Sequence, residues 1–241
     1  MPASFLTTKR IKLFADGADL RSMLELSRRP EIAGLTTNPT LMHKAGVRDY
    51  RAFAREILGE IRDKPISFEV VADDFAAMNR QAREMASWGA NVYVKIPITN
   101  SQAEPSLALV RELSHDGVKL NVTGVLALEQ VLGAAQALQG GAPAVLSVFA
   151  GRIADTGRDP VPLMQAALTI CRSLDPGIEL LWASPRELLN VIQAERVGCD
   201  IITVLPEILA KLPMLGKDLA ALSLDTVRMF LRDAAAAGYE L

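Results

Sequence analysis

The chain has 241 residues, of which half are hydrophobic, and its formal net charge is −2. This length can bury the core of one large α/β domain or of two small ones. The near-neutral charge argues against general binding to nucleic acid or to anionic membranes. The first ten residues lack the apolar segment of a signal peptide, and no apolar run is long enough to span a bilayer, so we expect a cytoplasmic protein.

The cysteines and histidines argue against two further classes of protein. Cys171 and Cys199 are too few for a disulfide framework, and neither lies in the spacing of metal ligands. His43 and His115 stand far apart in the sequence, which disfavours a histidine-rich catalytic metal site. We therefore expect no metal centre.

Short aliphatic or β-branched runs alternate with helical stretches along the chain. Residues 74–89 and 160–174 show helical spacing of apolar residues, and Gly89 and Gly198 are predicted to cap helices at their C-termini. There is no low-complexity linker and no change of composition, so a single domain over residues 1–241 is predicted. The expected strands lie in residues 12–17, 33–39, 66–71, 91–98, 119–125, 144–151, 179–185 and 201–206.

Alternating strands and helices predict a parallel sheet with right-handed crossovers. Eight such units in about 250 residues match the (β/α)8 TIM barrel, which carries its site at the carboxyl ends of the strands. A doubly wound open sheet is the alternative. The run 12–17 is not followed by the glycine-rich fingerprint of dinucleotide-binding proteins, which favours the barrel.

Polar residues recur near the predicted carboxyl ends of these strands. In residues 91–98 the valines and isoleucines share one face, while Tyr93 and Lys95 share the other, because successive side chains of a strand point to opposite sides. The first face is predicted to meet the helices and the second to point into the barrel. The same test selects Asp16, Thr36, Asn38, Glu69, Asn121, Thr123, Ser147 and Ser184.

Among these inward-facing polar residues, Lys95 indicates which reaction the group could catalyse. Burial disfavours the charged form of a lysine, and a free amine can attack a ketone to form a Schiff base, which permits carbon–carbon cleavage. Asp16 and Glu69 are candidates for the acid and the base, and Thr123 for holding a water molecule. The alternative is an ion pair between Lys95 and a carboxylate without a catalytic role. Each of these residues taken singly also has an ordinary structural explanation.

A second group of polar residues suggests a substrate with hydroxyl groups and an anionic end. The amides and hydroxyls of the set suit the hydroxyls of a polyol. Arg152 follows the sixth predicted strand, and Ser184 and Arg186 end the seventh. Two guanidinium groups beside a hydroxyl suit a phosphate or another tetrahedral oxyanion. As isolated surface residues, both arginines would simply be solvated.

These residues fall in a series of motifs that resembles the transaldolase family, including its shorter fructose-6-phosphate aldolase branch. The pattern of TTNP followed by VKIP at this distance is specific to that family. The resemblance implies a class I aldolase mechanism with sugar-phosphate substrates and without a metal or an organic cofactor. The matching motifs are FADGAD, GLTTNPT, SFEV, VYVKIPIT, LNVTGV, SVFAGRIADTG and ASPRE.

The resemblance also implies a role for each residue of the site. Lys95 forms the Schiff base, and Asp16 acts as acid and base in cleavage. Glu69 and Thr123 bind the catalytic water. The implied substrate contacts are Asn38 and Asn121 to the donor hydroxyls and the enamine, Ser147 to the dihydroxyacetone end, Phe149 in the same pocket, and Arg152, Ser184 and Arg186 to the phosphate.

The branch of the family is open at this point. Glu69, Asn121 and Phe149 resemble transaldolase proper, which passes a dihydroxyacetone unit from a ketose phosphate to an aldose phosphate. The donors implied are of the fructose 6-phosphate or sedoheptulose 7-phosphate type. The short chain resembles instead the aldolase branch, which releases dihydroxyacetone. We favour transaldolase, because site chemistry carries more information than length.

Two further alternatives follow from the details of the motifs. Gly124, Val148, Pro185 and Glu187 depart from the usual residues of the family, which leaves a sulfonated sugar open as the substrate of a sulfosugar transaldolase. A sugar-phosphate-binding protein that has lost catalysis is the other alternative. The complete set of a lysine, two carboxylates and a threonine counts against it, since binding alone needs no desolvated lysine.

Residues 213–241 are expected to form a helical tail beyond the barrel. The segment 223–238 predicts an amphipathic helix with Val227, Phe230 and Leu231 on one side. Compact members of the family use such a helix to reach a neighbouring subunit, often in decamers built from pentameric rings, so the resemblance implies a homo-oligomer. A helix packed on its own barrel is the alternative.

Overall fold

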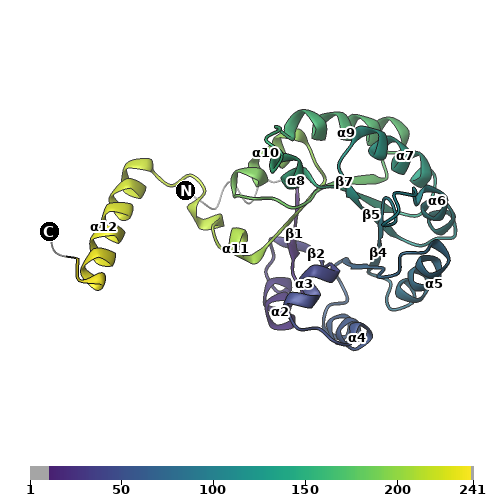
Figure 1. Ribbon diagram of the computed structural model, residues 1–241, viewed down its shortest axis with the longest axis horizontal. Coiled ribbons are helices and arrows are strands. Elements are labelled where there is room, and N and C mark those ends of the chain that lie inside the picture. Colours follow the sequence, from purple (N-terminus) through teal and green to yellow (C-terminus); the bar gives the residue numbers. More distant parts are fainter. Residues whose placement is uncertain (1–10, 240–241) are drawn as a thin grey trace.

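The computed structural model describes residues 11–239. The expectation about a signal peptide concerns residues 1–10, which lie outside this range. The parallel strands form a closed barrel in which β1 pairs with β8, and helices surround it (Figure 1). This is the (β/α)8 TIM barrel predicted from the sequence, followed by a C-terminal helix. The strands are β1 (Lys12–Asp16), β2 (Ile32–Thr36), β3 (Ile66–Glu69), β4 (Val92–Pro97), β5 (Leu120–Val125), β6 (Ala144–Val148), β7 (Ile178–Trp182) and β8 (Ile201–Val204).

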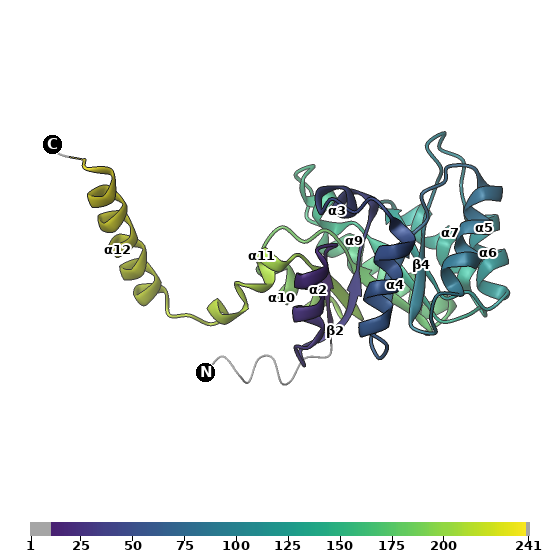
Figure 2. The ribbon, with the colours of Figure 1, turned by 90° about the horizontal axis from the view of Figure 1, so that it is seen from below.

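The helices lie on the outer side of the barrel, and the last of them stands apart from it (Figures 1 and 2). They are α2 (Leu20–Ser27), α3 (Pro39–Lys44), α4 (Tyr50–Glu60), α5 (Phe75–Ala86), α6 (Leu107–His115), α7 (Leu128–Leu138), α8 (Ala150–Ala154), α9 (Val161–Leu174), α10 (Leu189–Val197), α11 (Pro206–Leu209) and α12 (Leu219–Ala237), with a 3-10 turn η1 (Leu212–Met214) before the last.

Local hydrogen bonds decide where several helices begin and end. Asn38 and Asp74 each precede a helix, and their side chains accept hydrogen bonds from backbone N–H groups of its first turn. Gly198 ends α10 with a φ of 90°, as predicted. The predicted cap at Gly89 is wrong, because α5 ends at Ala86 and Ser87 is its C-cap. The Ser87 hydroxyl donates to the carbonyl of Glu84 at 2.6 Å and closes the last turn earlier.

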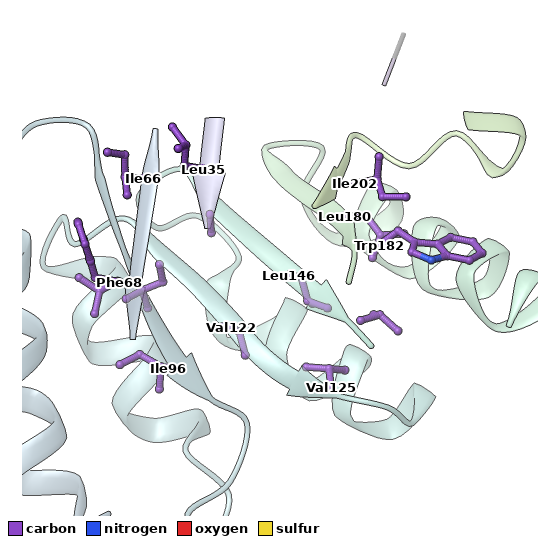
Figure 3. Packing of buried hydrophobic residues seen from close by; sticks show 14 of the residues in the cluster. Leu35, Ile66, Phe68, Ile96, Val122, Val125, Leu146, Leu180, Trp182 and Ile202 are labelled. Atoms are coloured by element: carbon purple, nitrogen blue, oxygen red, sulfur yellow. The ribbon is translucent and has the colours of Figure 1, made fainter. Parts of the chain in front are cut away.

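The two faces of the strands bury different kinds of side chain. Residues such as Leu35, Ile96 and Trp182 have no measurable exposure and belong to the large core between strands and helices, part of which Figure 3 shows. A smaller apolar cluster fills the barrel interior, and it includes Phe14 and Val145. Each of these two lies two residues before a polar site residue on the same face of its strand. The interior is therefore apolar toward the amino ends and polar toward the carboxyl ends.

Helix α12 has no buried residue, and its apolar side chains are largely exposed. The relative exposure is 58% for Val227, 61% for Phe230 and 71% for Leu231. Both ribbon views show the helix away from the barrel (Figures 1 and 2), so the alternative of a tail packed on its own barrel does not hold. Within residues 11–239, none of the helices combines the length and the apolar character needed to cross a membrane.

Candidate active site

A cavity of about 410 Å³ lies at the carboxyl ends of the barrel strands. Strand parity and the convergence of parallel strand ends together predict such a cavity, because inward-pointing polar groups of different strands then meet at one end. The structure brings all the sequence-predicted site residues into its lining. They are Asp16, Asn38, Glu69, Lys95, Asn121, Thr123, Ser147, Phe149, Arg152, Ser184 and Arg186.

Lys95 is buried in the wall of this cavity, with 6% of its surface exposed. Its Nζ lies 3.0 Å from Oε2 of Glu69 and donates a hydrogen bond of 3.1 Å to the carbonyl of Thr37. The strand register explains the pairing, because Glu69 on β3 and Asn121 on β5 are the direct neighbours of Lys95 on β4. Lys95 is thus in an ion pair, as the structural alternative expects. The pair faces a cavity, however, and provides an amine with a proton acceptor beside it.

Asp16 ends β1 and points into the same cavity. Loss of contact with water raises the pKa of this carboxyl above its usual range. The ammonium of Lys95 and a hydrogen bond of 2.8 Å from the Thr36 hydroxyl act in the opposite direction, and the charge of Glu69 adds to the rise. A carboxylate with a raised pKa is a stronger base, which suits proton transfer to and from a substrate hydroxyl.

The side chain of Asn121 on β5 is fixed by two serines, Ser147 on the neighbouring strand β6 and Ser67 on β3, one strand beyond β4. Oδ1 of Asn121 accepts a hydrogen bond of 2.7 Å from Ser147, and Nδ2 donates one of 3.0 Å to Ser67. All three residues are buried. This row of groups holds an amide and a hydroxyl at the cavity wall without freedom to rotate, which favours binding of a substrate with several hydroxyl groups.

Thr123 lies at a bend of β5. Its hydroxyl is buried and has no hydrogen-bond partner among residues 11–239. Gly124 follows with a φ of 74°, and the pairing of β5 with β6 is irregular between Val122 and Val125. A buried hydroxyl normally has a partner, so this geometry favours a polar group of a ligand or a bound water as the partner of Thr123.

The side of the cavity that carries Arg152 and Arg186 is built by α8 and by the loop after β7. The guanidinium of Arg152 lies 5.7 Å from the ring centroid of Phe149. Ser184 has a φ of 57°, a strained conformation for a serine that is most often kept at functional sites. Arg186 donates through Nε to Oδ1 of Asp155 at 2.9 Å and also pairs through Nη2 with the second oxygen. This ion pair lowers the pKa of Asp155.

Gly151 allows α8 to approach the loop after β7 closely. A Cβ added at Gly151 would lie 1.5 Å from the carbonyl oxygen of Ser184, so glycine is required for this close approach. Its backbone N–H also donates to the carbonyl of Ala183 at 3.3 Å. The approach places Arg152, the next residue, beside the loop that carries Ser184 and Arg186.

Metal ligands are not gathered in this cavity. Across the part of the chain that the structure describes, no group of three or more histidine, cysteine, aspartate and glutamate side chains is placed to hold an ion. Cys171 and Cys199 are both free and buried. The polar groups that line the cavity are two lysines, Lys44 and Lys95, together with carboxylates, amides, hydroxyls and guanidiniums, which can supply acid–base, nucleophilic and anion-binding chemistry.

Comparison with known proteins gives a consistent assignment. Residues 13–241 match the family model described as Transaldolase/Fructose-6-phosphate aldolase. The chain belongs to this family. A protein named "Probable transaldolase" from Thermoanaerobacter sp. is 40% identical over 194 residues, which cover 80% of this chain and 85% of the relative. Another of the same name from Clostridium acetobutylicum is 39% identical over 202 residues, which cover 84% of this chain and 89% of the relative.

A solved structure outside the family supports the fold alone. The tryptophan synthase α subunit of Campylobacter jejuni superposes with a TM-score of 0.55 at 12% sequence identity, covering 82% of this chain and 86% of that chain. The shared feature is the barrel, because identity at this level carries no information about the chemistry of a site. For this chain, information about the chemistry of the site comes from the cavity residues themselves.

Several residues that shape the family site were not singled out from the sequence. Ser67 has the same parity as Glu69 on β3, so the strand-face test could have found it. Tyr50 comes from α4: its hydroxyl donates to the carbonyl of Glu69 and accepts from its N–H, both at 2.8 Å. Asp155 follows α8. Tyr50 and Asp155 lie outside the strands, and strand periodicity therefore gives no signal for them.

Replacing Gly151 by alanine tests the architecture of the side of the cavity that carries the two arginines. The added methyl must push α8 away from the loop after β7, which moves Arg152 relative to Ser184. We expect the KM for a ketose phosphate to rise by roughly tenfold to a hundredfold, because misplacement by about 1 Å is costly in a preorganised site. Steady-state kinetics would measure this rise.

Gly59→Ala is the matched control, since a Cβ at Gly59 on α4 meets no atom within 4 Å. We expect it to leave KM unchanged. A Gly151→Ala variant with the KM of the original protein would show that the close approach does not affect substrate binding on this side of the cavity.

Proposed function

We propose that the protein is a transaldolase that works through a Schiff base on Lys95. It transfers a dihydroxyacetone unit from a ketose phosphate to an aldose phosphate. The observation that carries this proposal is the buried amine of Lys95 at the wall of a polar cavity. Its Nζ lies 3.0 Å from the carboxylate of Glu69 and interacts electrostatically with the carboxylate of Asp16. Membership of the transaldolase/fructose-6-phosphate aldolase family supports it.

The first step is attack of Lys95 on the ketone. Glu69 takes a proton from the ammonium, and the free amine then forms a bond to the carbonyl carbon, C2 of the ketose. The former carbonyl oxygen takes one proton from the attacking nitrogen and one from Glu69 and leaves as water, which gives the protonated imine. Glu69 and the hydroxyl of Thr123, which has no hydrogen-bond partner within residues 11–239, bind that water and exchange protons with it.

The second step breaks the bond between C3 and C4. Asp16 removes the proton of the C4 hydroxyl, and C4 becomes an aldehyde. The electron pair of the broken bond moves between C3 and C2, and the positive nitrogen on Lys95 accepts the displaced pair, so the intermediate is an enamine. From fructose 6-phosphate, the fragment that leaves is a three-carbon aldehyde phosphate. The raised pKa of Asp16 favours this proton removal.

The transfer step runs this chemistry in reverse with a new aldehyde. The enamine carbon attacks the acceptor, Asp16 returns its proton to the new hydroxyl, and water releases the product from Lys95. A four-carbon aldose phosphate gives sedoheptulose 7-phosphate. Protonation of the enamine instead of this attack would release dihydroxyacetone, which is the aldolase outcome. Phe149 lines the cavity with a ring that has no hydroxyl and cannot donate that proton, so it favours transfer.

The substrate contacts follow from the fixed groups of the cavity. We infer that Asn38, Asn121 and Ser147 bind the donor hydroxyls. Asn38 also caps α3 through its side-chain oxygen, which leaves its amide N–H groups for a ligand. The substrate's anion is bound by Arg152, Ser184 and Arg186. Since Asp155 engages one edge of the Arg186 guanidinium, the anion meets the remaining donors of that group.

An acceptor assay tests the proposed function. The protein is incubated with fructose 6-phosphate with and without a four-carbon aldose phosphate, and the sugar products are separated by chromatography. We expect seven-carbon product to form with the acceptor and little free dihydroxyacetone to form without it. Release of dihydroxyacetone at the same rate in both reactions would make the protein an aldolase. Turnover of a sulfonated ketose in preference to the phosphate would assign it the sulfosugar substrate.

We also propose that a second copy of the chain covers the apolar face of α12 in a homo-oligomer. The support is the exposure of Val227, Phe230 and Leu231 on a helix with no buried residue. Replacing Phe230 and Leu231 together by aspartate is expected to shift the particle mass toward that of one 26.0 kDa chain in light scattering. Arg232→Asp on the same helix is the control for added negative charge. An original protein that is already monomeric would contradict this proposal.

A further inference from the structure

The eighth strand contributes a polar residue to the barrel interior that has no role in the mechanism above. Thr203 of β8 lines the cavity and is 6% exposed. Its hydroxyl oxygen lies 2.5 Å from that of Thr36, which is 2% exposed. The hydroxyl of Thr36 in turn donates to Oδ1 of Asp16 at 2.8 Å. The three side chains therefore form a hydrogen-bonded chain that ends on the carboxyl of Asp16.

The strand order explains how three separate segments form this chain. Strand β1 lies between β2 and β8 in the closed barrel. Asp16 pairs in register with Thr36 on one side, and Phe14, two residues earlier on the same face, pairs with Thr203 on the other side. The two threonine hydroxyls meet on the inner face of the barrel, across β1, where the side chains have little freedom.

The number of hydroxyl hydrogens determines which group donates in each hydrogen bond from Thr203 through Thr36 to Asp16. A hydroxyl has one hydrogen to donate and two lone pairs that accept. Because Thr36 gives its hydrogen to the carboxylate of Asp16, the short contact with Thr203 requires the hydrogen of Thr203. A donor behind Thr36 polarises its hydroxyl and strengthens the bond that it gives to the carboxylate.

We propose that Thr203 is a positioning residue for Asp16, acting through Thr36. It orients the Thr36 hydroxyl so that its hydrogen points at Asp16, and thereby holds the ionised carboxylate in the orientation that removes a proton from the substrate. This inference rests on the proposed function, because it concerns the base of that reaction.

Loss of the Thr203 hydroxyl has a defined electrostatic consequence. The groups that face Asp16 are the ammonium of Lys95 on β4, the carboxylate of Glu69 on β3 and the hydroxyl of Thr36 on β2. A weaker bond from Thr36 stabilises the ionised form of Asp16 less, while the attraction of Lys95 and the repulsion of Glu69 remain. The acid side of the pH–rate profile therefore moves to higher pH when Thr203 cannot donate.

The test compares Thr203→Val, which keeps the shape and removes the hydroxyl, with Thr203→Ser, which keeps the hydroxyl. We measure kcat/KM of the full chain for fructose 6-phosphate and a four-carbon acceptor over a range of pH. For the valine variant we expect a loss of about fivefold near neutral pH, the worth of one hydrogen bond, and an acid limb displaced to higher pH. The serine variant is expected to restore both. Thr169→Val, at an exposed position on α9, is the control for loss of a threonine hydroxyl.

A double-mutant cycle separates this role from a general effect on packing. In a Thr36→Val background, Thr203→Val should cost little more, because the link to Asp16 is already broken. Additive losses, or a valine variant with the pH profile of the original protein, would overturn the inference. These outcomes require an active original protein. If the original protein transfers no dihydroxyacetone unit and traps no substrate on Lys95, it is the proposed function that fails.

Discussion

Replacement of Lys95 by methionine is expected to lower turnover by at least about a thousandfold, because Lys44, the other lysine that lines the cavity, is exposed and does not replace a buried nucleophile. Methionine has nearly the length of lysine and suits the buried position, where 6% of the lysine surface is exposed. The chain should therefore still fold. Turnover is measured with fructose 6-phosphate and a four-carbon acceptor.

Lys119→Met is the matched control. Lys119 directly precedes β5, at the amino end of the barrel, and donates to the carbonyl of Ala90 at 2.8 Å. We expect turnover within about twofold of the original protein, since surface substitutions away from a site have small effects. A Lys95→Met variant that keeps a substantial part of the activity would exclude the Schiff-base mechanism.

Replacement of Asp16 by asparagine is expected to lower kcat by roughly a hundredfold to ten-thousandfold, the usual contribution of a general acid–base group. The same change should raise stability at neutral pH. Burial raises the pKa of Asp16 in the folded state above the unfolded value near 3.8. The folded chain therefore holds the proton more tightly than the unfolded chain, and stability falls as pH rises from the unfolded pKa through the folded pKa.

The gain in stability from Asp16→Asn should thus be fully present above the folded pKa and should shrink as pH falls toward 3.8. Thermal unfolding at several pH values measures it. Asp175→Asn is a control of opposite sign, because backbone N–H groups of Gly140 and Gly177 lower the pKa of Asp175. That variant should lose stability at neutral pH. A melting temperature for Asp16→Asn below that of the original protein at pH 8 would contradict the account.

The fold and the membership of the cavity could be predicted because both depend on periodic features. Each strand was recognisable as a short β-branched run, and its inner face followed from two-residue alternation. Glu69, Lys95 and Asn121 come from different strands, yet each was assigned to the inner face, and in the structure they are neighbours in register. Parallel strands in a barrel all end at the same face of the barrel. Residues that were assigned separately to the inner faces of different strands therefore meet in one cavity.

The individual contacts could not be predicted in the same way. The 3.0 Å distance between Lys95 and Glu69 depends on register, which periodicity leaves undefined. Asp155 engages Arg186 from beyond α8, across a loop conformation that no motif specifies. Thr203 was recognised as part of a strand, but its contact with Thr36 spans 167 positions of sequence. Such pairings follow from closure of the barrel rather than from local sequence.

The C-terminal helix shows a different limit. Its amphipathic pattern predicted the helix, and the pattern was equally compatible with packing on the same barrel and on another chain. The structure excludes the first, since α12 buries none of its residues. The apolar face of a helix defines the chemistry of its partner surface, not which molecule provides that surface.

The proposed mechanism requires a covalent bond between Lys95 and the substrate during cleavage. The most direct measurement is to incubate the protein with fructose 6-phosphate, reduce with borohydride and locate the adduct by peptide mass spectrometry. We expect a reduced three-carbon adduct on Lys95, absent from Lys95→Met, together with release of a three-carbon aldehyde phosphate. An adduct on another residue, or none with either the phosphorylated or a sulfonated ketose, would contradict it.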